Sequence, residues 1–121
     1  MQLQIGYQEK DTGIAVVTVA GRLMQGPEGE RLEGVVKDLL ARGTRKILLD
    51  FSGLTHIDST GIGRTIAALN MVMQQGAQMV VAGAKGSVRE AFRITQLDRV
   101  FRFFDDFAAA EAALGNVPQT S

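Results

Sequence analysis

Residues 57–63, Ile-Asp-Ser-Thr-Gly-Ile-Gly, place oxygen-bearing side chains where a predicted helix begins. Asp58, Ser59 and Thr60 all favour the N-cap position, and a carboxylate there complements the positive end of the helix dipole. A hydroxyl at this position also suits phosphorylation, which adds about 1.5 to 2 negative charges and three strong acceptors. Two hypotheses follow: Ser59 is a phosphorylation switch, or Ser59 only caps the helix.

Gly61 and Gly63 fall in the first turn of the same predicted helix, where each costs up to roughly 1 kcal/mol relative to alanine. A sequence selected only for helix formation would avoid both. Without side chains, the backbone N–H groups are open to a second molecule or to an anion at the helix N-terminus. The glycines indicate a contact site, and tight packing of the helix on a sheet is the competing explanation.

The elements around this segment alternate between strands and helices. Helices are predicted for residues 32–40, with a stop at Gly43, and for residues 61–75, 87–97 and 107–114. Strands are predicted for residues 3–8 and 14–19, which form a hairpin, and for residues 46–51, 78–82 and 99–104. This order predicts an α/β fold with a mixed, mostly parallel sheet of about five strands, an N-terminal hairpin and about four helices. The largely apolar run at 46–51 should be its central strand.

Two details of these elements can be predicted from residue types. Ser87 and Glu90 have the spacing of a capping box, which should start the third helix. Met71, Met73 and Met79 recur at helical and strand spacing, so we expect them in the core, with Met71 the one that could face a partner.

The composition limits what the chain can do. Its 121 residues are enough for one core, so we expect a single domain at 1–115 and a flexible tail at 116–121. Its 13 basic and 13 acidic residues form no basic stripe for nucleic acid, and without cysteine and with one histidine it offers no thiolate or histidine cluster for a metal. The first residues do not resemble a secretory signal, and no apolar run could span a bilayer, so we expect a cytoplasmic protein without membrane insertion.

The motif at 57–63 is similar to the signature loop of the STAS family, in which a hydrophobic residue, Asp, Ser, Ser or Thr, and Gly-hydrophobic-Gly open the second helix. Three further segments resemble the family's second-strand exit, next strand and third helix. They are Val-Ala-Gly-Arg-Leu at 19–23, Gly-Ala-Gln-Met-Val-Val-Ala at 76–82 and Val-Arg-Glu-Ala-Phe-Arg-Ile-Thr-Gln-Leu at 88–97. The resemblance covers nearly the whole chain and implies the STAS fold.

Within this family the chain resembles the anti-sigma factor antagonists, in which the serine after the loop aspartate is phosphorylated by a partner serine kinase that is also the anti-sigma factor. By position this serine is Ser59, with Thr60 as second choice. The resemblance implies that the unphosphorylated form captures the kinase, the phosphorylated form releases it, and a serine phosphatase resets the switch. We expect a binding module without cofactor, catalytic residue or metal, as a monomer or weak homodimer. The expected partner-binding residues are Asp58, Ser59, Thr60, Gly61, Ile62, Gly63, Arg64 and Met24.

Two residues depart from the family pattern. Met24 stands where many members have an acidic residue after the second strand, so an expected partner contact is altered. Arg64, in the first turn of the helix, opposes the dipole but could pair with a phosphate on Ser59. The alternative function is a non-switching STAS scaffold subunit of a larger complex, such as a lipid-transport ATPase.

Two other groups could suggest enzymatic chemistry. Ser59 with His56 would suit a hydrolase, but no third orienting group is evident, and we expect His56 in a loop, partly packed. Asp50 is placed like the phospho-accepting aspartate of receiver domains, but the acidic cluster that would hold magnesium is missing. We therefore expect Asp50 to end its strand and the protein not to be an enzyme.

Overall fold

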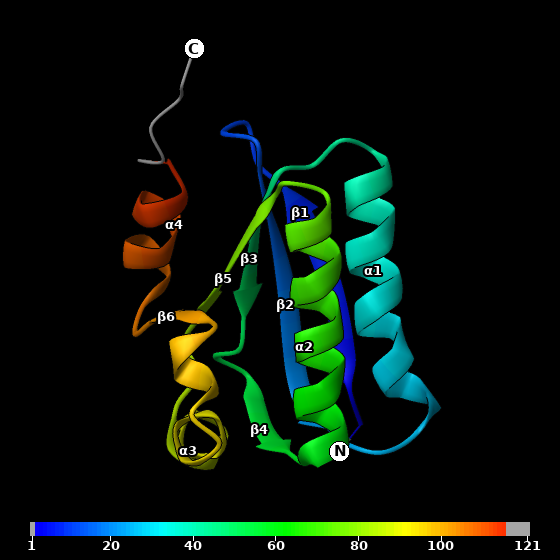
Figure 1. The fold of residues 1–121 in the computed structure, drawn as a ribbon, viewed down its shortest axis with the longest axis vertical. Helices are drawn as coiled ribbons and strands as arrows, with labels where there is room; N and C mark the ends of the chain where they lie inside the picture. Colours follow the sequence, from blue (N-terminus) through cyan, green and yellow to red (C-terminus); the bar gives the residue numbers. More distant parts are fainter. Residues whose placement is uncertain (1, 116–121) are drawn as a thin grey trace.

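A computed structural model describes residues 2–115, in which an N-terminal hairpin is followed by alternating helices and strands (Figure 1). The predicted tail at 116–121 lies outside the described residues. The strands are β1 (Gln4–Glu9), β2 (Ile14–Leu23), β3 (Lys46–Asp50), β4 (Leu54–Ile57), β5 (Gln78–Ala82) and β6 (Arg102–Phe104). The helices are α1 (Glu30–Ala41), α2 (Ser59–Gln74), α3 (Gly86–Ile94) and α4 (Phe107–Gly115), and short 3-10 turns lie at Pro27–Gly29 and Leu97–Arg99.

The sheet has β3 at its centre, as its apolar run predicts. Its strands follow the order β1-β2-β3-β5-β6, and β4 pairs with β2 outside this path. The β1–β2 pair is antiparallel, whereas β2–β3, β3–β5, β5–β6 and β2–β4 are parallel. The α/β class, the N-terminal hairpin and the mostly parallel sheet are thereby confirmed, with six strands in place of about five.

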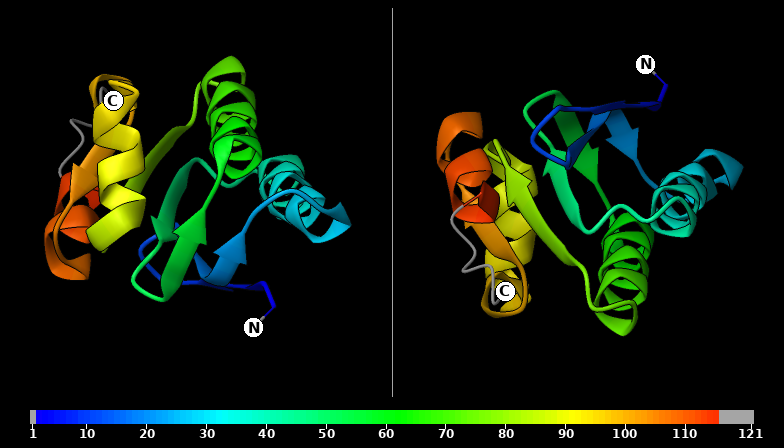
Figure 2. Two further views of the ribbon diagram at one scale, coloured as in Figure 1. Left: turned by 90° about the horizontal axis from the view of Figure 1, so that it is seen from below. Right: turned by 90° about the horizontal axis from the view of Figure 1, so that it is seen from above.

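Helices cover both faces of the sheet. In Figures 1 and 2, α1 and α2 lie side by side over one face, while α4 packs on β3, β5 and β6 from the other. Successive side chains of a strand point to opposite faces, so Ile47 and Leu49 belong to the larger core beneath α1 and α2, and Leu48 belongs to the smaller core beneath α4. Burial on both faces explains why β3 is a continuous apolar run.

A cluster of phenylalanine rings joins α3 to the rest of the fold. α3 buries only Val88 and Phe92 among its nine residues. The ring centroid of Phe92 lies 5.2 Å from that of Phe103, 5.5 Å from Phe101 and 6.4 Å from Phe51. Tilted and edge-on aromatic pairs at these separations stabilise one another beyond their buried area. The position of this mostly polar helix therefore depends chiefly on one ring.

The segment between β3 and α2 contains a strand that the sequence did not predict. β4 pairs with the end of β2, and the register of this pairing shifts between Gly21 and Arg22. The segment Leu-Thr-His-Ile has only four residues, with two polar residues side by side at Thr55 and His56, so its residue types do not signal a strand. In the structure both polar side chains are exposed. Pairing with β2 fixes its extended form. α2 also begins earlier than predicted, at Ser59.

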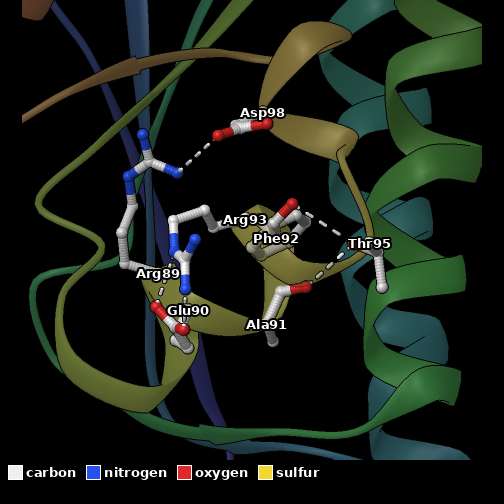
Figure 3. Close-up of polar contacts among 7 residues, drawn as sticks. All are labelled: Arg89, Glu90, Ala91, Phe92, Arg93, Thr95 and Asp98. Atoms are coloured by element: carbon white, nitrogen blue, oxygen red, sulfur yellow. Dashed lines mark hydrogen bonds and ion pairs between the residues drawn. The ribbon is translucent and has the colours of Figure 1, made fainter.

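The capping box predicted for the third helix is wrong. α3 begins at Gly86 with Lys85 in the N-cap position, and no side chain caps it, so Ser87 has no such role. Glu90 instead pairs with Arg93, whose Nε donates to its carboxylate at 2.8 Å (Figure 3). Residues three apart lie on one helix face, so this pair forms more readily than a bond back to the helix start.

The last predicted strand is shorter than expected. Of residues 99–104, only Arg102–Phe104 are extended. The preceding Leu97–Arg99 turn is closed by 3-10 bonds, with the N–H of Val100 donating to the Leu97 carbonyl at 3.0 Å. This turn changes the chain direction between α3 and β6 and leaves room for only one short pairing with β5.

The methionines differ in burial. Met79 is buried in β5 and Met71 packs against the core, but Met73 is 63% exposed. Positions two apart on an α-helix point to different sides, so Met71 and Met73 cannot both face the sheet. The prediction of a core position is wrong for Met73.

Replacing Phe92 by alanine should lower the free energy of unfolding by about 3 to 5 kcal/mol, because it leaves a cavity among three other rings. Urea denaturation followed by circular dichroism measures this loss. The matched control is Ile94→Ala on the same helix, whose side chain is 68% exposed. It should change stability by less than about 0.5 kcal/mol. Similar losses in the two variants would contradict this account of α3.

Candidate functional site

The pairing of β4 with β2 places the start of α2 at one end of the sheet (Figure 1). Leu23, the last residue of β2, lies opposite Ile57, the last residue of β4. The N–H of Asp58 then donates to the Leu23 carbonyl at 3.4 Å, and Asp58 is extended, with φ −115° and ψ −175°. A two-strand frame therefore positions Asp58 and Ser59 before the helix begins.

Both carboxylate oxygens of Asp58 accept a backbone hydrogen bond. Oδ1 accepts from the Gly61 N–H at 2.8 Å, which caps α2, and Oδ2 accepts from the Gln25 N–H at 2.9 Å. Partial burial raises the pKa of Asp58, but the hydrogen bonds from the backbone N–H groups, chiefly those of Gly61 and Gln25, together outweigh it. The pKa of Asp58 is therefore lowered from its usual value, and the ionised form joins two segments of the chain.

Ser59 is the first residue of α2 and its side chain is exposed. Because Asp58 is the N-cap, the hypothesis that Ser59 serves only as the cap is wrong. Thr60, the second choice for a phosphate, is half-buried. The site thus presents one exposed hydroxyl at the N-terminus of a helix, directly after a fixed carboxylate.

The two glycines of the first turn have different surroundings. A Cβ on Gly61 would overlap the Leu23 carbonyl oxygen and lie 2.8 Å from Cγ1 of Ile57. Packing of α2 on the ends of β2 and β4 therefore explains Gly61, which is buried and does not expose backbone to a partner. Gly63 is exposed, and a Cβ there would meet no atom within 4 Å. Gly63 lies one helical turn after Ser59, on the same face of α2. Packing therefore does not explain this glycine, which leaves the helix face beside Ser59 without a side chain.

Arg64 connects α2 to α1. Its guanidinium pairs with Glu33 at 3.1 Å and with Glu30 at 3.7 Å. Its side chain packs against Gly29: a Cβ added to Gly29 would lie 3.2 Å from Nε of Arg64. Within residues 2–115 this buried Nε has no hydrogen-bond partner. The guanidinium is therefore engaged with α1.

Met24 and Ile62 complete the residues expected to bind a partner. Met24 is half-buried directly after β2, with its sulfur 3.5 Å from a guanidinium nitrogen of Arg22, and it precedes the Gln25 N–H that binds Asp58. Ile62 is partly buried against the main core. The fold brings both to the same end of the sheet as Ser59.

His56 and Asp50 make local contacts. His56 lies in β4 and is exposed, unlike the partly packed loop residue expected, and its Nδ1 lies 2.8 Å from the Thr55 hydroxyl. Asp50 accepts hydrogen bonds from the Ser52 N–H at 3.0 Å and hydroxyl at 2.7 Å, which confirms its place at the end of β3. Residues 2–115 contain no group of three or more side chains placed to hold a metal ion. Over the same range, no helix has the length and apolar character needed to cross a membrane.

Sequence reasoning missed two residues of the site. Gln25 supplies a backbone N–H to Asp58, and Leu23 supplies the carbonyl that accepts from Asp58 and covers Gly61. Both act through the main chain, so their residue types carry no signal. Only the pairing of β2 with β4 would have revealed them.

Known proteins resemble this chain in sequence and in fold. Residues 8–110 match the family model of the STAS domain. The chain therefore belongs to the STAS domain family. A candidate anti-sigma factor antagonist of Bordetella bronchiseptica, BtrV, is 26% identical over 105 residues, which cover 87% of this chain and 90% of that protein.

Solved structures share the fold. An anti-sigma factor antagonist from Mycobacterium paratuberculosis superimposes with a TM-score of 0.82 at 19% identity, over 93% of this chain and 94% of that one. The anti-sigma factor antagonist SpoIIAA of Bacillus superimposes with a TM-score of 0.68 in its unphosphorylated and its phosphorylated form. These two matches have 15% and 14% identity, cover 91% of this chain in each case, and cover 94% and 99% of the SpoIIAA chains. At such identities the structures establish the STAS fold.

The two glycines of the first turn should respond to alanine with opposite signs. Gly61→Ala forces α2 away from the Leu23 carbonyl and should cost about 1 to 3 kcal/mol of stability. Gly63→Ala has free space and should add up to about 1 kcal/mol, because alanine favours the helix. Chemical denaturation of the two variants beside the wild type measures both. A loss at Gly63 equal to that at Gly61 would contradict the packing described.

Asp58→Ala should cost about 1 kcal/mol at pH 7, because the helix loses its N-cap. A lowered folded-state pKa means that the carboxylate stabilises the fold above its unfolded pKa, and that this stabilisation is lost as the pH falls through the folded pKa. The difference between wild type and variant should therefore shrink below about pH 4. Denaturation at several pH values tests this, with Asp11→Ala in the exposed β1–β2 turn as control. A difference that widens towards acid pH would contradict it.

Proposed function

We propose that this protein is an anti-sigma factor antagonist that binds an anti-sigma serine kinase while Ser59 is unphosphorylated and releases it when Ser59 carries a phosphate. The observation that carries the proposal is the exposed Ser59 at the first position of α2, directly after the fixed carboxylate of Asp58. Membership of the STAS family and the similarity to proteins named as anti-sigma factor antagonists support the function. The match to SpoIIAA, which has a phosphorylated form, supports the modification.

A phosphate on Ser59 would stand beside a carboxylate that two N–H groups keep in place. Neutralisation by Arg64 would require that residue to give up its ion pairs with α1. In an interface that excludes water, two neighbouring anions are poorly solvated and repel each other. Affinity for the partner should therefore fall on phosphorylation, with little compensation from nearby cations.

The proposal has four further parts, which concern the activity, the domain, the contact surface and the reversal of the switch. The protein acts as a binding module and not as an enzyme, and residues 1–115 form its single domain in the cytoplasm. The bare helix face at Gly63, together with Met24, Thr60 and Ile62, forms the contact surface around Ser59. A serine phosphatase restores the free hydroxyl.

The test begins with capture of partners from the native cytoplasm by the wild-type protein, Ser59→Asp and Ser59→Ala. Mass spectrometry identifies the bound proteins and any phosphate. We expect wild type to bind a small serine kinase that phosphorylates Ser59, and Ser59→Ala to accept no phosphate. With purified kinase, calorimetry should show at least about tenfold weaker binding by Ser59→Asp, because a like charge enters the interface.

The matched control is Thr12→Asp, which adds the same charge in the exposed β1–β2 turn at the other end of the sheet. It should bind the kinase like wild type. Phosphate transfer to Ser59→Ala with unchanged occupancy would show that another residue is modified. If one stable partner binds wild type and Ser59→Asp equally and Ser59 is never modified, the scaffold function, as in a lipid-transport ATPase, replaces the switch.

A further inference from the structure

A second surface, formed by residues 93–102 at the end of α3, the 3-10 turn and the start of β6, carries two exposed apolar side chains. We call it the α3 corner. Ile94 is 68% exposed and Val100 is 56% exposed. Among the described residues the large exposed apolar side chains are Tyr7, Met73, Ile94 and Val100. Single exposed apolar residues need no explanation, but two within seven residues of the chain make this segment a candidate contact surface.

Hydrogen bonds hold the α3 corner in a defined shape. The hydroxyl of Thr95 donates to the Ala91 carbonyl at 2.8 Å and closes α3 (Figure 3). Gln96 follows with φ 61°, and no other non-glycine residue within 2–115 has a positive φ. The N–H of Val100 then donates to the Leu97 carbonyl at 3.0 Å. Such a backbone conformation persists only where its surroundings fix it, so the backbone between Ile94 and Val100 has a defined path.

The α3 corner also carries positive charge. Residues 93–102 contain three basic residues and one acidic residue. Arg93 is paired with Glu90, and Asp98 is paired with Arg89 (Figure 3). The two remaining basic side chains, Arg99 and Arg102, are exposed.

The helix at which this surface begins lies beside the strand that leads to the candidate site. α3 packs against β4, the strand that leads directly into Asp58 and Ser59. Both α3 and the start of α2 lie at the lower end of the molecule in Figure 1, and the view from below in Figure 2 shows them together. One partner could therefore cover both regions without contacting the hairpin end.

We propose that the α3 corner is a second contact region for the partner that recognises Ser59, and that it binds an acidic protein surface with an apolar pocket. The proposal rests on the switch function proposed above. Ile94 and Val100 would fill the pocket and supply affinity, while Arg99 and Arg102 would select a partner of complementary charge. Ser59 thus controls whether the partner binds, and the α3 corner controls which partner binds.

The experiment uses the purified serine kinase identified with the wild-type protein and two double variants, Ile94→Ser with Val100→Ser and Arg99→Glu with Arg102→Glu. All four side chains are exposed, so both variants should keep wild-type stability in urea. Calorimetry should show at least about tenfold weaker binding for each. Added salt should weaken wild-type binding more than that of the charge variant. Matched controls are Met73→Ser on α2 and Arg45→Glu before β3, which should bind like wild type.

The outcomes separate the two proposals. Kinase binding within about twofold of wild type by both double variants overturns the role of the α3 corner and leaves the Ser59 switch intact. Failure of wild type to bind any kinase removes both. Two further results would reassign the corner if kinase binding were unchanged: wild-type dimers that the apolar variant loses, or binding to vesicles of anionic lipid that the charge variant loses.

Discussion

The carboxylate of Asp58 connects the parts of the molecule that meet at the site. One oxygen caps α2 through Gly61, and the other holds the segment after β2 through Gln25. Because that segment leads through a 3-10 turn into α1, one ionised group links the starts of both helices to the end of β2. The contact of Arg64 with α1 adds a second connection farther along α2. The residue beside Ser59 therefore also connects several elements of the fold.

The sequence predicts the fold well because its information is local and repetitive. Apolar runs at β3 and β5 and the helical spacing in α1 and α2 place four elements within a few residues of their observed bounds. The candidate hydroxyl is also predictable, since Asp-Ser-Thr followed by two glycines is unusual at a helix start. These features depend on residue type, which is what a sequence shows directly.

The missed features depend on contacts between distant segments. β4 is extended only because the end of β2 lies beside it, and Gln25 serves the site through its backbone. The capping box at Ser87 failed for a related reason: Glu90 had a stronger partner in Arg93 than the helix start could offer. Gly61 looked like an opening for a ligand, yet the Leu23 carbonyl occupies the space that a side chain would need.

The short turn between β3 and β4 limits how this protein could be altered by insertion or grafting. The N–H of Leu54 donates to the Phe51 carbonyl at 2.9 Å, and the Gly53 carbonyl accepts from the N–H of Gly21 at 2.9 Å, so its three residues are fixed at both ends. One residue added to this turn would shift β4 along β2 and bring a side chain other than Asp58 to the N-cap position of α2. A designer who moved the motif to another scaffold would therefore have to transplant the end of β2 and this turn with it.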